Sequence, residues 1–222
     1  MGLDMYMSRV KKIDGMTPEE IIVAANYIDY LNRPAKYADS TFSGWCGGDE
    51  SKVRKDKIED VKKNINTQYS AWDTDHEYGH EGVCEGVAYW RKANAIHKYF
   101  VDNVADGVDN CEPVIISKEI LEDLLDRAKK VKTASKLIDG EVHNGYHYNS
   151  NGEMEPIIEK GKIIEDDSVA CELLPTTEGF FFGSTDYDQW YLEDIESTIE
   201  QIAKILETTD FDTEYVIYEA SW

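Results

Sequence analysis

The sequence lacks several features that mark common classes of protein. It has no Cys-x-x-Cys pair and no Gly-x-x-x-x-Gly-Lys-Ser/Thr stretch. It also has no apolar run near the roughly 18 residues that a membrane-spanning helix needs. Four scattered cysteines are typical of reduced thiols in a cytosol, and the missing Gly-rich stretch is the loop that holds nucleotide phosphates in P-loop enzymes. We therefore expect no disulfide, no membrane span and no P-loop chemistry.

Positive charge is also scarce. The chain has 23 lysines and arginines against 45 aspartates and glutamates, a formal net charge of −22. Such a charge repels nucleic acid and anionic membranes, so we expect neither as a direct partner. The acidic surface either serves solubility alone or imitates nucleic acid towards a protein that binds it. The N-terminal MGLDMYMSRV has neither the basic region nor the apolar core of a signal peptide, so we expect a cytoplasmic protein.

The composition that is present indicates a folded chain. Of 222 residues, 41% are hydrophobic, and 14 tyrosines with 5 tryptophans exceed what a disordered chain carries. This length suits one hydrophobic core. We predict an α+β fold in which residues 1–222 form a single domain, a small and mostly antiparallel sheet with several helices packed against it.

Residue patterns place the elements of this fold. Alternation over 3–10 predicts a strand, and Thr17, Pro18 and Glu20 begin a helix with a capping box. We predict further helices over 51–65, 83–104 and 117–131, and a strand, a glycine turn and a helix within 178–206. Strands are expected over 214–222 and within 162–175. We expect exposed loops over 33–50 and 138–156, the second of which also fits a hairpin.

The string HEYGH matches a zinc-hydrolase pattern. His76 and His80 stand four residues apart with Glu77 between them, and Cys84 adds a further four-residue step. These residues share a face only in a helix, which Gly79 disfavours and which has no apolar stripe to bury. We therefore expect no metal and no cofactor. A metal-dependent hydrolase remains an alternative.

Two other stretches carry candidate ligand-binding residues. The first, YWRKANAIHKYFVDNV, is predicted to form a helix with an aromatic face beside a cluster of cations. In the second, GFFFGSTDYD, three phenylalanines precede a polar run at a predicted helix N-terminus. The predicted ligand-binding residues are Trp90, Arg91, Lys92, Asn94, His97, Lys98, Phe181, Ser184, Thr185 and Tyr187. The alternative is that Trp90 and His97 are core residues, that the cations are solvated or paired to surface carboxylates, and that the polar run caps a helix.

Four stretches together carry a resemblance. MGLDMY, YWRKANAIHKYFVDNV, LLPTTEGFFFGSTDYDQWYLEDI and the terminal SW resemble an uncharacterised protein family of bacteriophages and prophages. The resemblance implies an accessory protein of the host bacterial cytoplasm. We expect a non-enzymatic counter-defence protein that sequesters a nucleotide-type signal. The alternatives are an acidic inhibitor of a host defence enzyme, as a nucleic-acid mimic, and the metal-dependent hydrolase. The many aromatic residues also favour a homo-oligomer.

Overall fold

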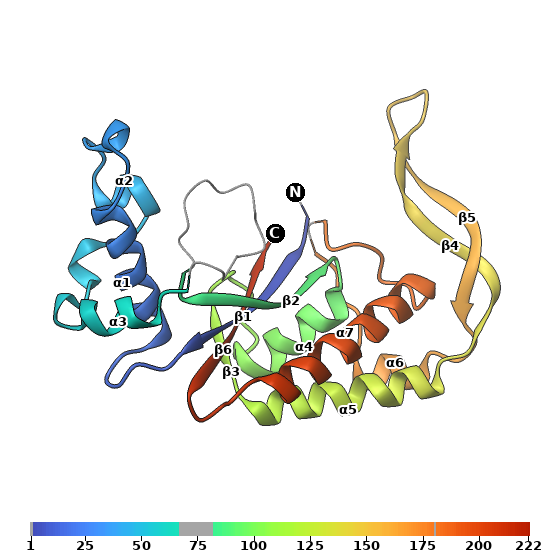
Figure 1. Cartoon of the computed structure of the whole chain (residues 1–222). Coiled ribbons are helices and arrows are strands. Elements are labelled where there is room, and N and C mark those ends of the chain that lie inside the picture. Colours follow the sequence, from blue (N-terminus) through green and yellow to red (C-terminus); the bar gives the residue numbers. More distant parts are fainter. Residues whose placement is uncertain (1, 67–81, 180) are drawn as a thin grey trace. The chain divides into compact units, whose positions relative to one another are not determined.

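A computed structural model describes residues 2–66, 82–179 and 181–222, and it confirms the α+β prediction. A four-stranded antiparallel sheet has the order β2-β1-β6-β3, and β4 and β5 form a second sheet (Figure 1). The strands are β1 (Asp4–Lys11), β2 (Cys84–Arg91), β3 (Val114–Ile116), β4 (Leu137–Tyr148), β5 (Met154–Ile164) and β6 (Glu214–Ser221). The helices are α1 (Pro18–Leu31), α2 (Phe42–Cys46), α3 (Ile58–Asn64), α4 (Asn94–Val104), α5 (Lys118–Ala134), α6 (Ser168–Leu173) and α7 (Gln189–Thr208).

The chain divides into two compact units. Unit 1 consists of Met1–Tyr6, Ala88–Thr208 and Tyr218–Trp222, and unit 2 of Met7–Val87 and Thr209–Ile217. The boundary falls within β1, β2 and β6, so each of these strands contributes residues to both units. The expectation of a single domain stays a prediction.

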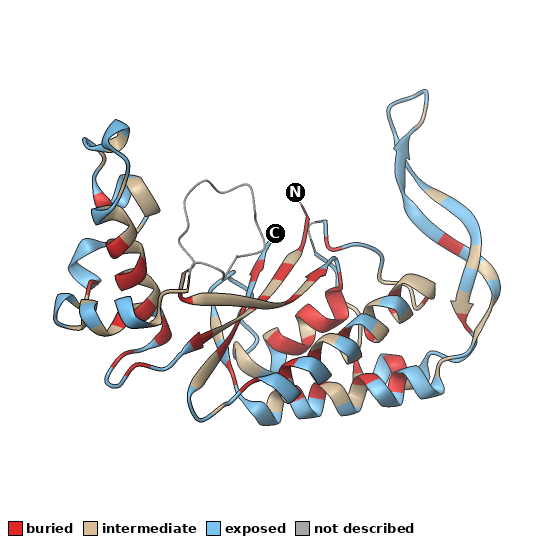
Figure 2. Ribbon diagram, in the orientation of Figure 1, coloured by how far each residue is buried: buried red, intermediate tan, exposed pale blue. Residues whose placement is uncertain are grey.

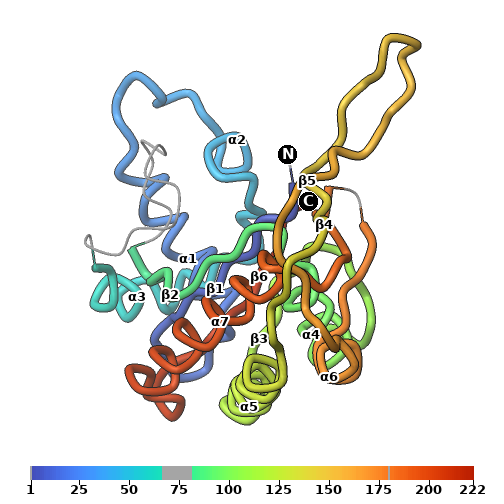
Figure 3. Tube along the Cα trace, turned by 90° about the vertical axis from the view of Figure 1, so that its right-hand side faces the viewer, coloured from blue at the N-terminus to red at the C-terminus, as the bar shows by residue number. Residues whose placement is uncertain are grey.

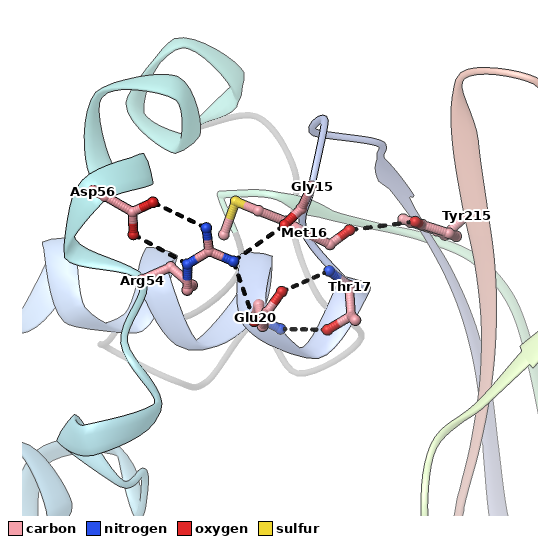
Figure 4. A network of polar contacts seen from close by, with 7 residues as sticks. All are labelled: Gly15, Met16, Thr17, Glu20, Arg54, Asp56 and Tyr215. Atoms are coloured by element: carbon pink, nitrogen blue, oxygen red, sulfur yellow. Dashed lines mark hydrogen bonds and ion pairs between the residues drawn. The ribbon is translucent and has the colours of Figure 1, made fainter.

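Unit 2 has its own core and a well-capped helix. Its buried residues are Val10, Ile13, Met16, Ile21, Ala24, Ala25, Ile28, Val61, Val83 and Ile217. The predicted capping box is confirmed, because the Thr17 hydroxyl accepts from the Glu20 amide and the Glu20 carboxylate accepts from the Thr17 amide. Arg54 pairs with Asp56, donates to the Gly15 carbonyl and approaches Glu20 (Figure 4). This network connects the chain before α3 to the first turn of α1.

The core of unit 1 lies where strands meet α4 and α7. Trp90 on β2 packs against Phe100 on α4, and Phe100 packs against Tyr218 on β6 with ring centroids 4.3 Å apart. The Trp90 indole donates to the hydroxyl of Thr198 on α7 over 2.9 Å. Helix α5 packs along α7, and the sides on which these helices meet are buried (Figure 2).

The helix predicted over 83–104 is wrong in its first half. Residues Cys84–Arg91 form strand β2, and only Asn94–Val104 are helical. Ala88 and Trp90 are buried while Tyr89 is half-buried and Arg91 is exposed, which is the period of two of a strand. The apolar spacing of this segment suited both a helix and a strand. The segment forms a strand because it pairs with β1 and because Tyr and Trp favour strands.

Four other local predictions need correction or refinement. Residues 33–50 are not a loop throughout, since they contain α2, whose Phe42 is buried. Residues 138–156 lie mostly in β4 and β5, so the hairpin interpretation is the right one. The residues that the structure describes within 179–182 do not form the predicted strand. Of the strand predicted within 162–175, only the part up to Ile164 is present, and α6 follows it.

Two further expectations concern single features of the chain. The four cysteines, Cys46, Cys84, Cys111 and Cys171, are all free thiols. Among the described residues, no helix combines the length and the apolar character that crossing a membrane requires.

Candidate functional site

Segments that are far apart in the sequence meet at one corner of unit 1. The backbone amide of Lys92, after β2, donates to the carbonyl of Leu3, before β1, over 2.7 Å. The Asn94 side chain donates to the carbonyls of Phe182 and Ser184, and its oxygen accepts from the amide of Thr177. Gly2 lies beside Lys92 and Phe181, and Trp222 packs on Phe182. The labels N and C accordingly lie near each other in Figures 1 and 3. The four stretches that carry the family resemblance therefore meet here.

A chain of hydrogen bonds runs through the centre of this corner. His97 is 2% exposed, its Nδ1 lies 2.7 Å from the Tyr218 hydroxyl, and its Nε2 lies 3.0 Å from Asp109 Oδ2. Because a carboxylate only accepts, Nε2 carries a proton, and in the neutral ring Nδ1 accepts from Tyr218. The other oxygen of Asp109 accepts from the indole of Trp222 over 3.0 Å. The C-terminal residue is thus tied to α4 through Asp109.

This chain has the connectivity of a catalytic triad but different chemistry. Burial and the negative charge of Asp109 raise the pKa of Tyr218 well above its ordinary value. A nucleophile needs a lowered pKa or an open approach, and Tyr218 is only 4% exposed. A cavity of about 20 Å³ adjoins His97, Asp109 and Tyr218, which is room for about one water molecule. The arrangement holds the corner together and does not supply a nucleophile.

Two of the four non-glycine residues with positive φ in the described part of the chain lie at the same corner. Lys92 and Phe181, neither of them glycine, have φ values of 60° and 59°. They lie close to each other, because a Cβ placed on Gly2 would contact Lys92 Cε at 3.5 Å and the Phe181 carbonyl at 3.7 Å. Left-handed residues of this kind cost of order 1–3 kcal/mol each and occur often at functional sites. Here the strain turns a cationic and an aromatic side chain outwards.

The outer surface of the corner combines cations with aromatic rings. The Arg91 side chain is 62% exposed and forms a long ion pair with Asp4 at 3.9 Å. Lys92 is exposed as well. Phe181 is 55% exposed and Trp222 44%, and Trp222 packs edge-on against Phe182. In a protein of net charge −22, this is a local surface suited to an anionic and partly aromatic ligand.

The other predicted ligand-binding residues are engaged within the protein. Trp90 and His97 are buried and hydrogen-bonded, as the core alternative expected, and Asn94 is buried and hydrogen-bonded as well. Lys98 pairs with Asp102 over 2.8 Å. The Ser184 hydroxyl accepts from the Asp186 amide, and the Thr185 carbonyl and the Tyr187 hydroxyl accept from Thr176. Of these residues, Asn94, Ser184, Thr185 and Tyr187 position the chain between α6 and α7, and Arg91, Lys92 and Phe181 are exposed.

The polar run of 184–186 does not cap a helix. Helix α7 begins only at Gln189, and Asp188 caps it by accepting from the amides of Trp190 and Tyr191. Burial raises the pKa of Asp188. The expected phosphate-type site at Ser184 and Thr185 is therefore not at a helix end.

The candidate metal ligands are only partly placed. His76, Glu77 and His80 lie outside the described residues, and Cys84 is half-buried at the start of β2. No group of three potential ligands gathers within the residues that the structure describes.

Sequence patterns gave no reason to select Asp109, Tyr218 or Trp222 as site residues. Asp109 lies in a loop, and Tyr218 looks like any core residue of a strand. The terminal SW was noted only as part of a resemblance, and its contact with Asp109 depends on the tertiary fold. A comparison with protein-family models, with curated proteins and with solved structures finds no significant match.

Proposed function

We propose that the protein is a non-enzymatic binding protein that sequesters a nucleotide-type small molecule at this corner, as a counter-defence protein of a phage would. The observation that carries the proposal is that exposed Lys92 and exposed Phe181 both lie beside Gly2. The exposed cation Arg91 precedes Lys92 in the chain, and the exposed Trp222 packs on Phe182, next to Phe181. These side chains come from three separate segments, and together they offer charge for phosphate and a ring face for a base.

The contacts at this corner also limit the affinity that can be expected. Stacking of one base on an aromatic ring contributes about 1–3 kcal/mol, and each charge-assisted hydrogen bond contributes about 1.5–3 kcal/mol. One stack and two such bonds sum to about 4–9 kcal/mol. After an association cost of at least about 4 kcal/mol, about 5 kcal/mol or less remains, which corresponds to a dissociation constant of about 0.2 mM or weaker. Effective sequestration at this affinity requires abundant protein.

Calorimetric titration with AMP, a cyclic dinucleotide and ribose 5-phosphate tests the proposal. We expect Arg91→Ala and Lys92→Ala to weaken binding of the nucleotides at least tenfold. Phe181→Ala should weaken the nucleotides and spare ribose 5-phosphate, which has no base to stack. Lys98→Ala is the matched control, because Lys98 already pairs with Asp102, and it should leave binding within about twofold.

Analysis of the ligand after incubation separates storage from turnover. With ligand in large excess, a sequestering protein leaves the nucleotide chemically intact. Conversion of many equivalents per chain would make the protein an enzyme and contradict the proposal. The absence of binding by all three probes at millimolar concentration would contradict it as well.

A second candidate function is an acidic protein inhibitor that imitates nucleic acid, and one observation favours it. The basic stretch 51–65 is neutralised by carboxylates, since each of its cations has an acidic partner within 4.0 Å. These cations are Lys52, Arg54, Lys55, Lys57, Lys62 and Lys63. These cations are therefore paired within the chain, and the excess of carboxylates over cations is available to attract a basic partner. Association of this kind weakens steeply with salt, whereas a stacked ligand is affected less.

A further inference from the structure

The hairpin of β4 and β5 exposes an apolar face on its distal half. Tyr146, Tyr148, Met154 and Ile158 are 67%, 75%, 62% and 45% exposed, and they are four of the nine large hydrophobic residues that the structure shows exposed in its described part. The distal half of the hairpin extends past α6 and α7 (Figure 1). Nearly all of it is coloured as exposed in Figure 2. Exposed apolar clusters of this kind usually mark an interaction surface.

The strand register puts these side chains on one face. Tyr146 is opposite Pro156 and Tyr148 is opposite Met154, and opposed residues of antiparallel strands point to the same side. Ile158 follows Pro156 by two residues and shares that side. His147 is opposite Glu155, with their side chains 3.7 Å apart, on the other face. The distal hairpin is therefore an amphipathic ribbon.

The body of unit 1 covers only the base of the ribbon. Gln189 of α7 accepts from the Lys162 amide, and His143 contacts Asp186. Val142 is buried at this base. Beyond His143, an isolated two-stranded ribbon is marginally stable in water, so a cover over its apolar face would stabilise it.

The charge distribution indicates the occupant. Segment 144–158 has only two charged residues, Glu153 and Glu155, of which Glu155 lies on the polar face and Glu153 belongs to the turn, hydrogen-bonded to Asn149. Two chains of charge −22 repel each other elsewhere, but the ribbon offers them a neutral apolar surface. Two ribbons packed face to face in opposite directions keep their attachment points roughly 20 Å apart at 3.4 Å per residue. That exceeds the Debye length of about 8 Å at physiological salt.

We propose that the apolar face of this hairpin docks the same face of a second copy of the chain, as a two-fold symmetric dimer. Such an isologous contact is the commonest way in which identical chains associate. From the aromatic areas involved, each face offers on the order of 400 Å², so the pair buries about 800 Å². An interface of that size lies below the roughly 1,200 Å² of stable complexes and is in the range of weak, transient association. The inference is independent of the proposed ligand.

Sedimentation velocity of the full chain over about 2–300 μM, at low and high salt, tests it. We expect a monomer at low concentration, a dimer at high concentration, and a tighter dimer in high salt because salt screens repulsion between the acidic chains. A partner attracted by the acidic surface would show the opposite salt dependence.

Variants distinguish the two faces of the ribbon. Tyr146→Asn with Tyr148→Asn should weaken the dimer at least tenfold, and His147→Asn, on the same strand but the other face, should change it less than twofold. A photo-reactive benzoylphenylalanine at position 148 should cross-link two chains into a species of twice 25.4 kDa, and at position 147 it should not. Cross-linking tests the interface without the double tyrosine substitution, which could itself destabilise the hairpin. A monomer at all concentrations and salts, or a dimer unaffected by the tyrosine variants, would overturn the inference.

Discussion

The imidazole of His97 lies 2.7 Å from the hydroxyl of Tyr218, 121 residues later in the chain. Asp109 holds the other side of the ring and also receives the Trp222 indole. One buried histidine therefore connects α4, β6, the loop after α4 and the C-terminus. The corner that carries the proposed binding surface depends on this contact.

Replacement of His97 by leucine should destabilise the protein. The Tyr218 hydroxyl and Asp109 then lose their shared partner while Tyr218 remains buried, at a cost of about 2–4 kcal/mol in the free energy of unfolding. Tyr218→Phe, which removes only one hydroxyl, should cost about 1 kcal/mol. Urea unfolding measures both, and a His97→Leu protein within 0.5 kcal/mol of the parent, a margin below the mean value of one hydrogen bond, would show that the chain contributes no stability.

Trp90 and Thr198 should show energetic coupling. The indole donates to the Thr198 hydroxyl over 2.9 Å, and both residues are buried. A double-mutant cycle with Trp90→Phe and Thr198→Val should give a coupling energy of about 1 kcal/mol. Additive effects of the two substitutions would contradict the assignment of Trp90 as a hydrogen-bonded core residue.

Asp194 should make stability depend on pH. Burial, together with the charges of Glu193 and Asp188, raises the pKa of Asp194 to about 7, whereas an unfolded aspartate has a pKa of about 3.9. The folded state therefore binds a proton more tightly, and ionisation of Asp194 above pH 7 opposes folding. Asp194→Asn should raise the free energy of unfolding at pH 8.5 by about 1–2 kcal/mol, a moderate figure because the residue is only half-buried by exposed area. This advantage should shrink as the pH falls from 7 towards 4, and an advantage that is constant over this range would contradict the assignment.

Lys92→Gly should separate stability from binding. Glycine adopts the φ of 60° without the penalty that lysine carries, so we expect the free energy of unfolding to rise by about 0.5 kcal/mol. Lys92→Val should lower it, because a β-branched residue fits this conformation worst. Both variants remove the cation, so both should bind nucleotide at least tenfold more weakly in calorimetry. Equal stability of the two variants would show that the position is not strained.

Much of the fold could be predicted from local patterns, because those patterns agree with the tertiary structure. Thr17 and Glu20 cap α1, Ser117 caps α5, and Leu3, Met5 and Met7 alternate inwards along the first strand. Around Trp90 the apolar spacing suited both a helix and a strand, and only pairing with β1 decides between them. At Ser184 the polar run resembled a cap, but α7 begins later, where Asp188 is placed to accept from the first amides.

The candidate site was harder to predict than the fold. The sequence indicated Arg91, Lys92 and Phe181, but not that Asn94 would join their segments. Trp90 and His97 have chemistry suited to a ligand, and burial gives them partners within the core. Asp109 and Trp222 acquire their roles only from contacts that span 113 residues of sequence.

Native mass spectrometry of the protein equilibrated with a cyclic dinucleotide over about 0.1–5 mM tests the central claim most directly. We predict a one-to-one adduct of nucleotide mass that needs at least tenfold more nucleotide in the Arg91→Ala protein and forms as in the parent in the Lys98→Ala protein. No adduct over this range, or an adduct unaffected by Arg91→Ala, would contradict the claim that this corner sequesters a nucleotide.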